Sequence, residues 1–157
     1  MKLIYFLLIV SLVGIFIFIY KSGVLDLGNS KYKQATVTIK GERFRVDVAD
    51  TMVSRGLGLE GRTGLTTSEG MLFVFNSLAN RTFWMKGVSF SIDIIWIAGD
   101  KVVGFAENTV PHKDEPLNKV FRYPSVNKVN RVLEVTAGTV ERLGIVVGDD
   151  VTVNFED

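Results

Sequence analysis

Four side chains of different chemistry, Trp84, Lys86, Ser91 and Asp93, occur in one short stretch of alternating polar and apolar residues. If Gly87-Val88 is a two-residue turn, the residues on either side of it pair as a hairpin. Strand alternation then places the four side chains on one face, opposite an apolar face. An indole among hydroxyl, ammonium and carboxylate groups is typical of a ligand-binding surface. The alternative is a solvated outer face on which a loop covers the tryptophan.

A second hypothesis assigns acid–base chemistry to Asp93 and Glu107. Glu107 falls in the apolar phase of its expected strand, so its carboxylate is either buried beside a cation such as Arg55 or Arg81, or placed where the strand ends. Glycosidases use paired carboxylates roughly 5–10 Å apart across a cleft. The strand phases put Asp93 and Glu107 on different faces, which favours a binding module over an enzyme.

Several familiar chemistries are disfavoured by the sequence. Gly56, Gly58 and Gly61 match the pattern G-x-G-x-x-G, but a nucleotide site needs a strand before the glycines and a helix after them. We expect these glycines to form turns. His112 is the only histidine, so a zinc site would need an otherwise all-carboxylate ligand set. The absence of cysteine excludes disulfides, thiol catalysis and cysteine metal sites. From these observations together we expect no metal, cofactor or nucleotide.

The elements that must position these residues are short strands separated by turns. Val37, Ile39 and Phe44 alternate with polar residues around Gly41-Glu42, which predicts a two-residue hairpin turn. Met71–Phe75 is a continuous apolar run, typical of a strand buried on both faces. We therefore expect an all-β, mostly antiparallel fold, a compact barrel or sandwich with two short helices. The buried residues are expected to include Phe73, Phe83, Met85, Ile92 and Ile94.

Two short helices and one long loop interrupt the expected strands. Asp50 is predicted to cap a helix over residues 51–57, and Gly144 to end a helical turn over 139–143. Residues 109–127 contain all three prolines and show no periodicity. They are predicted to form a long surface loop.

The first twenty-one residues predict a transmembrane anchor. Leu3–Tyr20 carries no charge, and as a helix it would span roughly 27 Å, close to the thickness of a bilayer core. A cleaved signal peptide is the alternative, but Lys21-Ser22-Gly23 is a poor cleavage site. We expect a single pass through the cell membrane, with residues 22–34 as a linker and the domain from 35 to 157 outside the cytoplasm. Because the lysines flanking the span are nearly balanced, the alternative is a reversed anchor with the domain in the cytoplasm.

The charge balance of the predicted domain argues against nucleic acid as a partner. Residues 35–157 hold 14 lysines and arginines against 16 aspartates and glutamates, a net charge of −2. No run of basic residues gives this domain an electrostatic footprint for nucleic acid. The stretch is long enough for one hydrophobic core and too short for two ordinary domains.

Ten short motifs follow one another along the chain in this order: Val48-Ala-Asp50-Thr, Arg55-Gly-Leu57, Glu69-Gly-Met-Leu-Phe-Val-Phe75, Phe83-Trp-Met-Lys86, Ile92-Asp93-Ile94, Glu107-Asn108, Val132-Leu-Glu-Val135, Ala137-Gly138, Leu143-Gly-Ile145 and Gly148-Asp149. In order and spacing they resemble the DUF192 (UPF0127) family over about residues 35–155. The resemblance implies a compact β-rich fold, often behind a signal or anchor segment, and no established activity. The chain departs from the family pattern at Ser91, where proline is expected, and at Gly58, where methionine is common.

The expected function is a membrane-anchored binding or accessory module of the cell envelope. Trp84, Lys86, Asp93 and Ser91 are its predicted ligand-binding residues, with Arg55 and Glu107 as secondary candidates. An envelope glycan, a peptide or a protein would be the partner. The alternative is a carboxylate-based hydrolase or lyase that acts on an envelope polymer.

Overall fold

The computed structural model describes residues 32–111, 116, 119 and 121–156. The predicted anchor and His112 lie outside these residues. Within the described part of the chain, no helix is long and apolar enough to cross a membrane. Tyr32–Asp157 forms one compact unit, whose first strand begins at Lys33, slightly before the predicted domain start.

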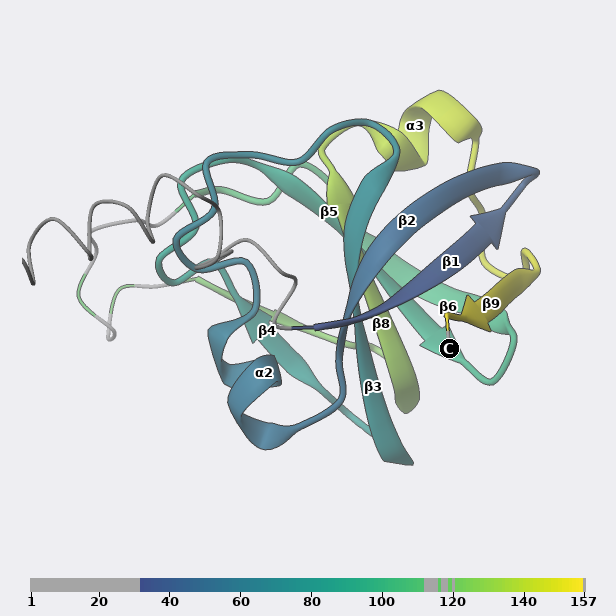
Figure 1. Cartoon of the computed structure of the whole chain (residues 1–157), viewed down its shortest axis with the longest axis horizontal. Helices are drawn as coiled ribbons and strands as arrows, with labels where there is room; N and C mark the ends of the chain where they lie inside the picture. The colour runs from purple at the N-terminus through teal and green to yellow at the C-terminus, as the bar shows by residue number, and fades with distance from the viewer. Residues whose placement is uncertain (1–31, 112–115, 117–118, 120, 157) are drawn as a thin grey trace, which may run out of the picture. The chain divides into compact units, whose positions relative to one another are not determined.

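Seven strands form one mixed sheet in the order β6-β5-β8-β3-β2-β1-β9 (Figure 1). All neighbouring strands are antiparallel except β2 and β3, which are parallel. Parallel neighbours need a crossover connection, and here the connection contains a short helix, α2. The strands are β1 (Lys33–Ile39), β2 (Glu42–Ala49), β3 (Glu69–Ala79), β5 (Ile92–Ala98), β6 (Lys101–Ala106), β8 (Val129–Thr136) and β9 (Val151–Phe155).

The sheet curls into a half-barrel, so that its two edge strands approach each other. Val102 N donates to Asp149 O at 3.0 Å, and Val151 N donates to Asp100 O at 2.8 Å. These bonds join the edge of β6 to the start of β9. They satisfy backbone groups that an open edge would leave unpaired. Over residues 32–156, as far as they are described, the fold is therefore mostly β with two short helices, as expected.

The turn between β1 and β2 is Lys40-Gly41 rather than the predicted Gly41-Glu42. Ile39 pairs with Glu42, and both turn residues have positive φ, 53° and 82°. Two positive φ angles fit the type I′ turn, which matches the right-handed twist of hairpin strands. The prediction that the apolar residues of both strands face the core is confirmed, because Val37, Ile39 and Phe44 are fully buried.

Two hydrophobic clusters lie on opposite faces of the sheet. The first includes Leu72, Ile95 and Leu133 and is extended by Val140 of α3 (Thr139–Leu143), which ends at Gly144 as predicted. The second covers the other face of the same strands. Four of the five predicted core residues are buried, and Phe83 is half-buried. The members of the second cluster are Ala49, Leu59, Met71, Phe73, Met85, Val88, Ile92, Ile94, Trp96, Val129 and Val132.

The second cluster is covered by α2 (Met52–Leu57) and a two-stranded sheet of β4 (Thr82–Trp84) and β7 (Arg122–Pro124). The N-cap of α2 is Thr51 instead of the predicted Asp50. Ser54 N donates to Thr51 Oγ1 at 3.0 Å, and Thr51 N donates to Ser54 Oγ at 2.9 Å. This reciprocal pair satisfies two free donors at the helix start.

The predicted hairpin around Gly87-Val88 is wrong. Val88 N does close a turn onto Met85 O, but β4 pairs with β7, while β5 pairs with β6 and β8. Six consecutive residues of β5 are buried, so this strand fits only inside the sheet, with a partner on each side. The predicted long loop over 109–127 is also wrong in part, because it contains β7.

Candidate functional site

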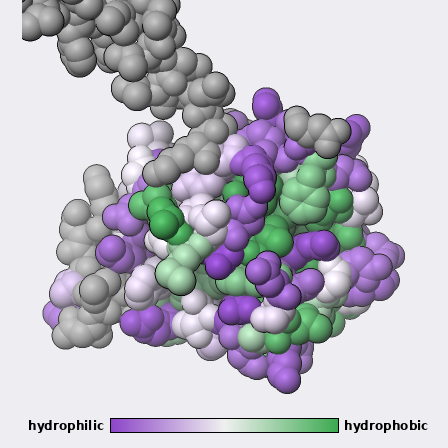
Figure 2. Space-filling model, turned by 60° about the horizontal axis from the view of Figure 1, so that its bottom comes forward, coloured by the Kyte–Doolittle hydropathy of each residue, from purple (hydrophilic) through white to green (hydrophobic). Residues whose placement is uncertain are grey.

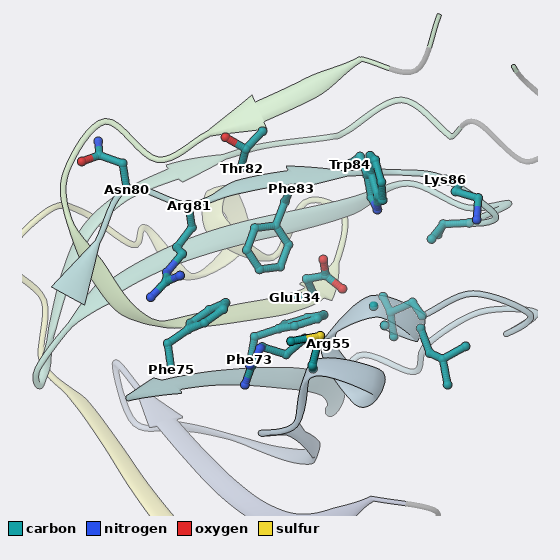
Figure 3. A pocket seen from close by; sticks show the side chains of 16 residues that line it. Arg55, Phe73, Phe75, Asn80, Arg81, Thr82, Phe83, Trp84, Lys86 and Glu134 are labelled. Atoms are coloured by element: carbon teal, nitrogen blue, oxygen red, sulfur yellow. The ribbon is translucent and has the colours of Figure 1, made fainter. Parts of the chain in front are cut away.

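A cavity of about 460 Å³ opens between α2, β3 and β4, beside Trp84 (Figure 3). Its volume lies within the range of about 300–1,000 Å³ that is usual for small-molecule sites. On the face seen in Figure 2, apolar surface gathers between hydrophilic side chains. Met52 and Leu57 of α2 line the cavity and are exposed, so its mouth is partly apolar.

Four aromatic rings line this cavity, two from β3 and two from β4. Alternation along β3 puts Phe73 and Phe75 on the same face. The Phe73 and Phe83 rings meet edge to face, with centroids 4.8 Å apart. Trp84 is 40% exposed and so keeps a free ring surface toward the cavity mouth. Gly58, which ends α2 beside the Phe73 ring, has a φ of 50°, a backbone conformation that favours glycine.

Two arginines contact the Phe75 ring. The Cζ atoms of Arg55 and Arg81 lie 4.9 Å and 4.1 Å from its centroid. Arg55 Nη1 donates to Asp50 O and to Val74 O, and Arg81 Nη2 donates to Ser77 O at 3.0 Å. These bonds fix both guanidinium groups along one side of the cavity. The Nε of Arg81 is buried and has no acceptor among the described residues.

The opposite end of the cavity carries a third cation, Lys86. Its Nζ lies 3.9 Å from Glu60 Oε2, and both side chains are more than two-fifths exposed. A pair with this exposure contributes little to stability and leaves the ammonium group accessible. Arg122 of β7 lies over the Trp84 ring, with its Cζ 5.0 Å from the centroid. The indole is therefore held between the cavity and a guanidinium group.

A buried carboxyl, that of Glu134 on β8, lies at the inner end of the cavity. The residue is 5% exposed, and its neighbours across the sheet are Met71 and Ile94. Burial raises the pKa of the Glu134 carboxyl to about 8, although the nearby Arg62 guanidinium opposes this shift. No donor in the described part of the chain hydrogen-bonds to this carboxyl. Below about pH 8 it is therefore a neutral acid in an apolar setting.

Three of the predicted site residues, Trp84, Lys86 and Arg55, line this cavity together. The prediction that Ser91 and Asp93 share a face with Trp84 is wrong, because the hairpin on which it rested does not form. Ser91 is half-buried ahead of β5 and does not line the cavity. Glu107 is exposed just beyond the end of β6.

Asp93 is a structural residue rather than a surface group. It is fully buried, and its Oδ1 accepts from Asn108 N at 2.8 Å. Its Oδ2 accepts from Val140 N at 2.9 Å. Gly138, the N-cap of α3, has no side chain to cap the helix, so Asp93 does so from β5. Because Asp93 is fully buried and both its oxygens are bonded to backbone amides, its carboxylate is not placed to act as a base together with the exposed Glu107.

Glu134 was missed as a site residue by the sequence reasoning. The available signal was a single acidic residue inside Val132–Val135, an apolar run typical of a strand buried on both faces. An ionisable group in such a run must be paired, neutral or functional. In the described residues, no three histidine, aspartate or glutamate side chains gather closely enough to hold a metal ion.

The chain is thus a small β protein, built as a half-barrel with an added two-stranded sheet and an amphipathic cavity. The chain belongs to the DUF192 family, described as "Uncharacterized ACR, COG1430", whose sequence profile matches residues 35–153. No curated protein matches the chain.

Two solved structures have a similar fold. The first, from Sinorhizobium meliloti 1021, is named as a proposed transcription regulator; it shares 29% sequence identity, with a TM-score of 0.67 over 78% of this chain and 95% of that one. The second is a protein of unknown function from Novosphingobium aromaticivorans. It shares 37% identity, with a TM-score of 0.66 over 76% of this chain and 83% of the other.

Proposed function

We propose that the chain is a membrane-anchored, extracytoplasmic binding module whose cavity holds a small anion with an apolar body. The observation that carries the proposal is the meeting of four aromatic rings and three cations around one cavity. Aromatic walls supply apolar contact, and a few placed polar groups supply orientation and specificity. The membrane part of the proposal is supported by the sequence of Leu3–Tyr20.

The charges around the cavity favour an anion. Arg55, Arg81 and Lys86 are cationic, and Glu134, the only acidic residue among the described lining residues, is neutral below about pH 8. Guanidinium groups present several donors in a fixed plane that suits carboxylate and phosphate oxygens. A cationic ligand would instead meet like charges at both ends of the cavity, which is costly at short range.

A binding role fits the cavity better than glycoside hydrolysis. That reaction needs two carboxyl groups across a cleft, and among the described lining residues Glu134 supplies one. The Asp93–Glu107 pair does not replace them, since Asp93 is buried away from the cavity. A glycan with acidic groups, an acidic peptide end and an anionic lipid headgroup all share the ligand chemistry that we propose.

The direct test uses three small probes with one phenyl body and different charge: phenylacetate, phenylacetamide and phenethylamine. We expect the detergent-solubilised full-length protein to bind phenylacetate saturably at pH 7, and to bind the other two at least tenfold more weakly. Arg81→Gln should weaken phenylacetate binding. Equal binding of all three probes, or no saturable binding of phenylacetate, contradicts the proposed function.

A further inference from the structure

The feature that carries a further inference is the unpartnered carboxyl of Glu134. Its strand neighbours in the β3 and β5 ladders, Met71 and Ile94, offer no polar atom from their side chains that could donate to it. The carboxyl points into the cavity between the Phe73 and Phe83 rings (Figure 3). More than nine-tenths of the residue is buried, so bulk water solvates it poorly.

The backbone fixes Glu134 in this position. β8 is a central strand, paired with β3 on one side and β5 on the other. Gly70 on β3 lets the two strands approach closely, because a Cβ there would lie 2.6 Å from the Glu134 carbonyl oxygen. The side chain therefore cannot swing away from the cavity by a shift of its strand. A polar group held in an apolar setting with no partner is costly, and a ligand can remove that cost.

Cations predominate among the described charged groups near this carboxyl. Two acids are also near: Asp47, on the same rung of the sheet beyond Met71, is salt-bridged to Arg62, and Glu60 is paired with Lys86. Arg55 comes from α2, Arg62 from the loop after it, and Arg81 and Lys86 flank β4. The charge of Arg62 favours loss of the proton, yet burial outweighs it and the pKa of Glu134 is raised. The acid form has an O–H donor, and that donor lacks an acceptor in the described protein. An anionic ligand drawn in by the cations brings acceptor oxygens.

We propose that Glu134, in its acid form, donates the hydrogen bond that positions the anionic group of the ligand at the inner end of the cavity. Glu134 is thus the specificity-determining residue of the site. This inference rests on the proposed function, because it requires that the cavity take an anion. No bond to carbon forms or breaks, and the proton stays on Glu134 or is shared with the ligand oxygen.

The sign of the pH dependence follows from this role. A bound anion stabilises the protonated form of Glu134. At a pH where the carboxyl of the free protein is ionised, binding therefore takes up a proton. Affinity for an anion should be constant from pH 6 to about pH 7.5, and should then fall toward tenfold per pH unit above pH 8. A cationic ligand held by the carboxylate would show the opposite trend, with affinity rising through the same range.

The test is a titration of the full-length protein with phenylacetate between pH 6 and pH 9, for wild type and two variants. Glu134→Gln keeps a neutral donor of the same size, so it should bind within about threefold of wild type, with a flat pH profile. Glu134→Leu removes the donor and should bind at least tenfold more weakly at pH 7. Calorimetry in two buffers of different ionisation enthalpy should show proton uptake by wild type near pH 8.5, and none by Glu134→Gln.

Two results would overturn this inference while the proposed function stands. One is a flat pH profile for wild type with Glu134→Leu binding normally. The other is loss of phenylacetate binding in Glu134→Gln, which would show that the carboxylate itself is needed. Phenethylamine binding that strengthens with pH and vanishes in Glu134→Gln would make the cavity a cation site. That outcome, or the absence of phenylacetate binding to wild type, overturns both.

Discussion

Asp93 and Glu134 lie on adjacent rungs of the β5–β8 ladder and project from opposite faces of the sheet. Asp93 pairs with Val135 and Ile94 with Glu134, so the two carboxyl groups are separated by the thickness of one sheet. Asp93 accepts two backbone N–H groups, whereas Glu134 accepts none in the described structure. The first carboxyl is committed to the fold, and the second is available to a ligand.

Removal of the Asp93 charge should destabilise the protein. Asp93→Asn keeps the shape but turns one acceptor oxygen into an NH₂ group that faces a backbone N–H. Hydrogen bonds to charged groups contribute about 1.5–3 kcal/mol each, so we expect a loss of at least about 2 kcal/mol in the free energy of unfolding. Urea unfolding followed by the fluorescence of buried Trp96 measures it.

Glu107→Gln is the matched control for this substitution. Glu107 is exposed beyond β6, so its change should stay within about 0.5 kcal/mol of wild type. An Asp93→Asn protein as stable as this control would show that Asp93 does not hold α3 and the loop at Asn108 in place.

The acid form of Glu134 should make stability depend on pH. The folded pKa, about 8, lies above the ordinary value of 4.5, so the stabilising contribution is complete below about pH 4.5 and is lost as pH rises toward 8. The free energy of unfolding should therefore fall by roughly 1.4 kcal/mol per pH unit within that window.

Glu134→Gln isolates this effect, because the amide does not titrate. The stability of wild type minus that of Glu134→Gln should fall steadily between pH 5 and pH 8 and level off above it. A difference that stays constant from pH 5 to pH 9 would mean that Glu134 is ionised in the folded protein throughout.

The fold was predictable wherever the alternation of apolar and polar residues along a strand determines which side chains are buried. Val37 and Phe44 were placed correctly, since strands with one buried face alternate regularly. The pairing of β5 was not predictable in this way, because its partner β8 lies far along the chain, and a turn at Gly87-Val88 looks the same locally whether or not a hairpin follows. β7 was missed because its pairing with β4 depends on tertiary contact and not on local pattern.

The candidate site was partly predictable for the same reason. Trp84 and Lys86 stood out as large or charged side chains in a strand whose other face is apolar. Asp93 was wrongly grouped with Trp84, because two residues on different strands share a face only if the strands pair as expected. Glu134 was overlooked for a different reason. A single acidic residue in an apolar run indicates that its charge must be neutralised, but the sequence does not show whether the side chain faces a cavity.

The membrane anchor is testable independently of the cavity. If Leu3–Tyr20 is an uncleaved single span, the full-length protein should remain in the membrane fraction after alkaline carbonate washing. A protease added outside intact cells, with any outer envelope permeabilised, should digest the domain. A soluble fragment that begins near Ser22 would contradict the uncleaved anchor. Protection of the domain from the protease would contradict its placement outside the cytoplasm.

Trp84 tests the central claim most directly, because it is both accessible and part of the cavity wall. Calorimetric titration of full-length Trp84→Ala with phenylacetate at pH 7 should show binding at least tenfold weaker than wild type, with stability within about 1 kcal/mol. Phe155→Ala, at an exposed aromatic outside the cavity, is the matched control and should bind normally. The account is contradicted if Trp84→Ala binds like this control, or if it loses about 3–5 kcal/mol of stability as a buried aromatic would.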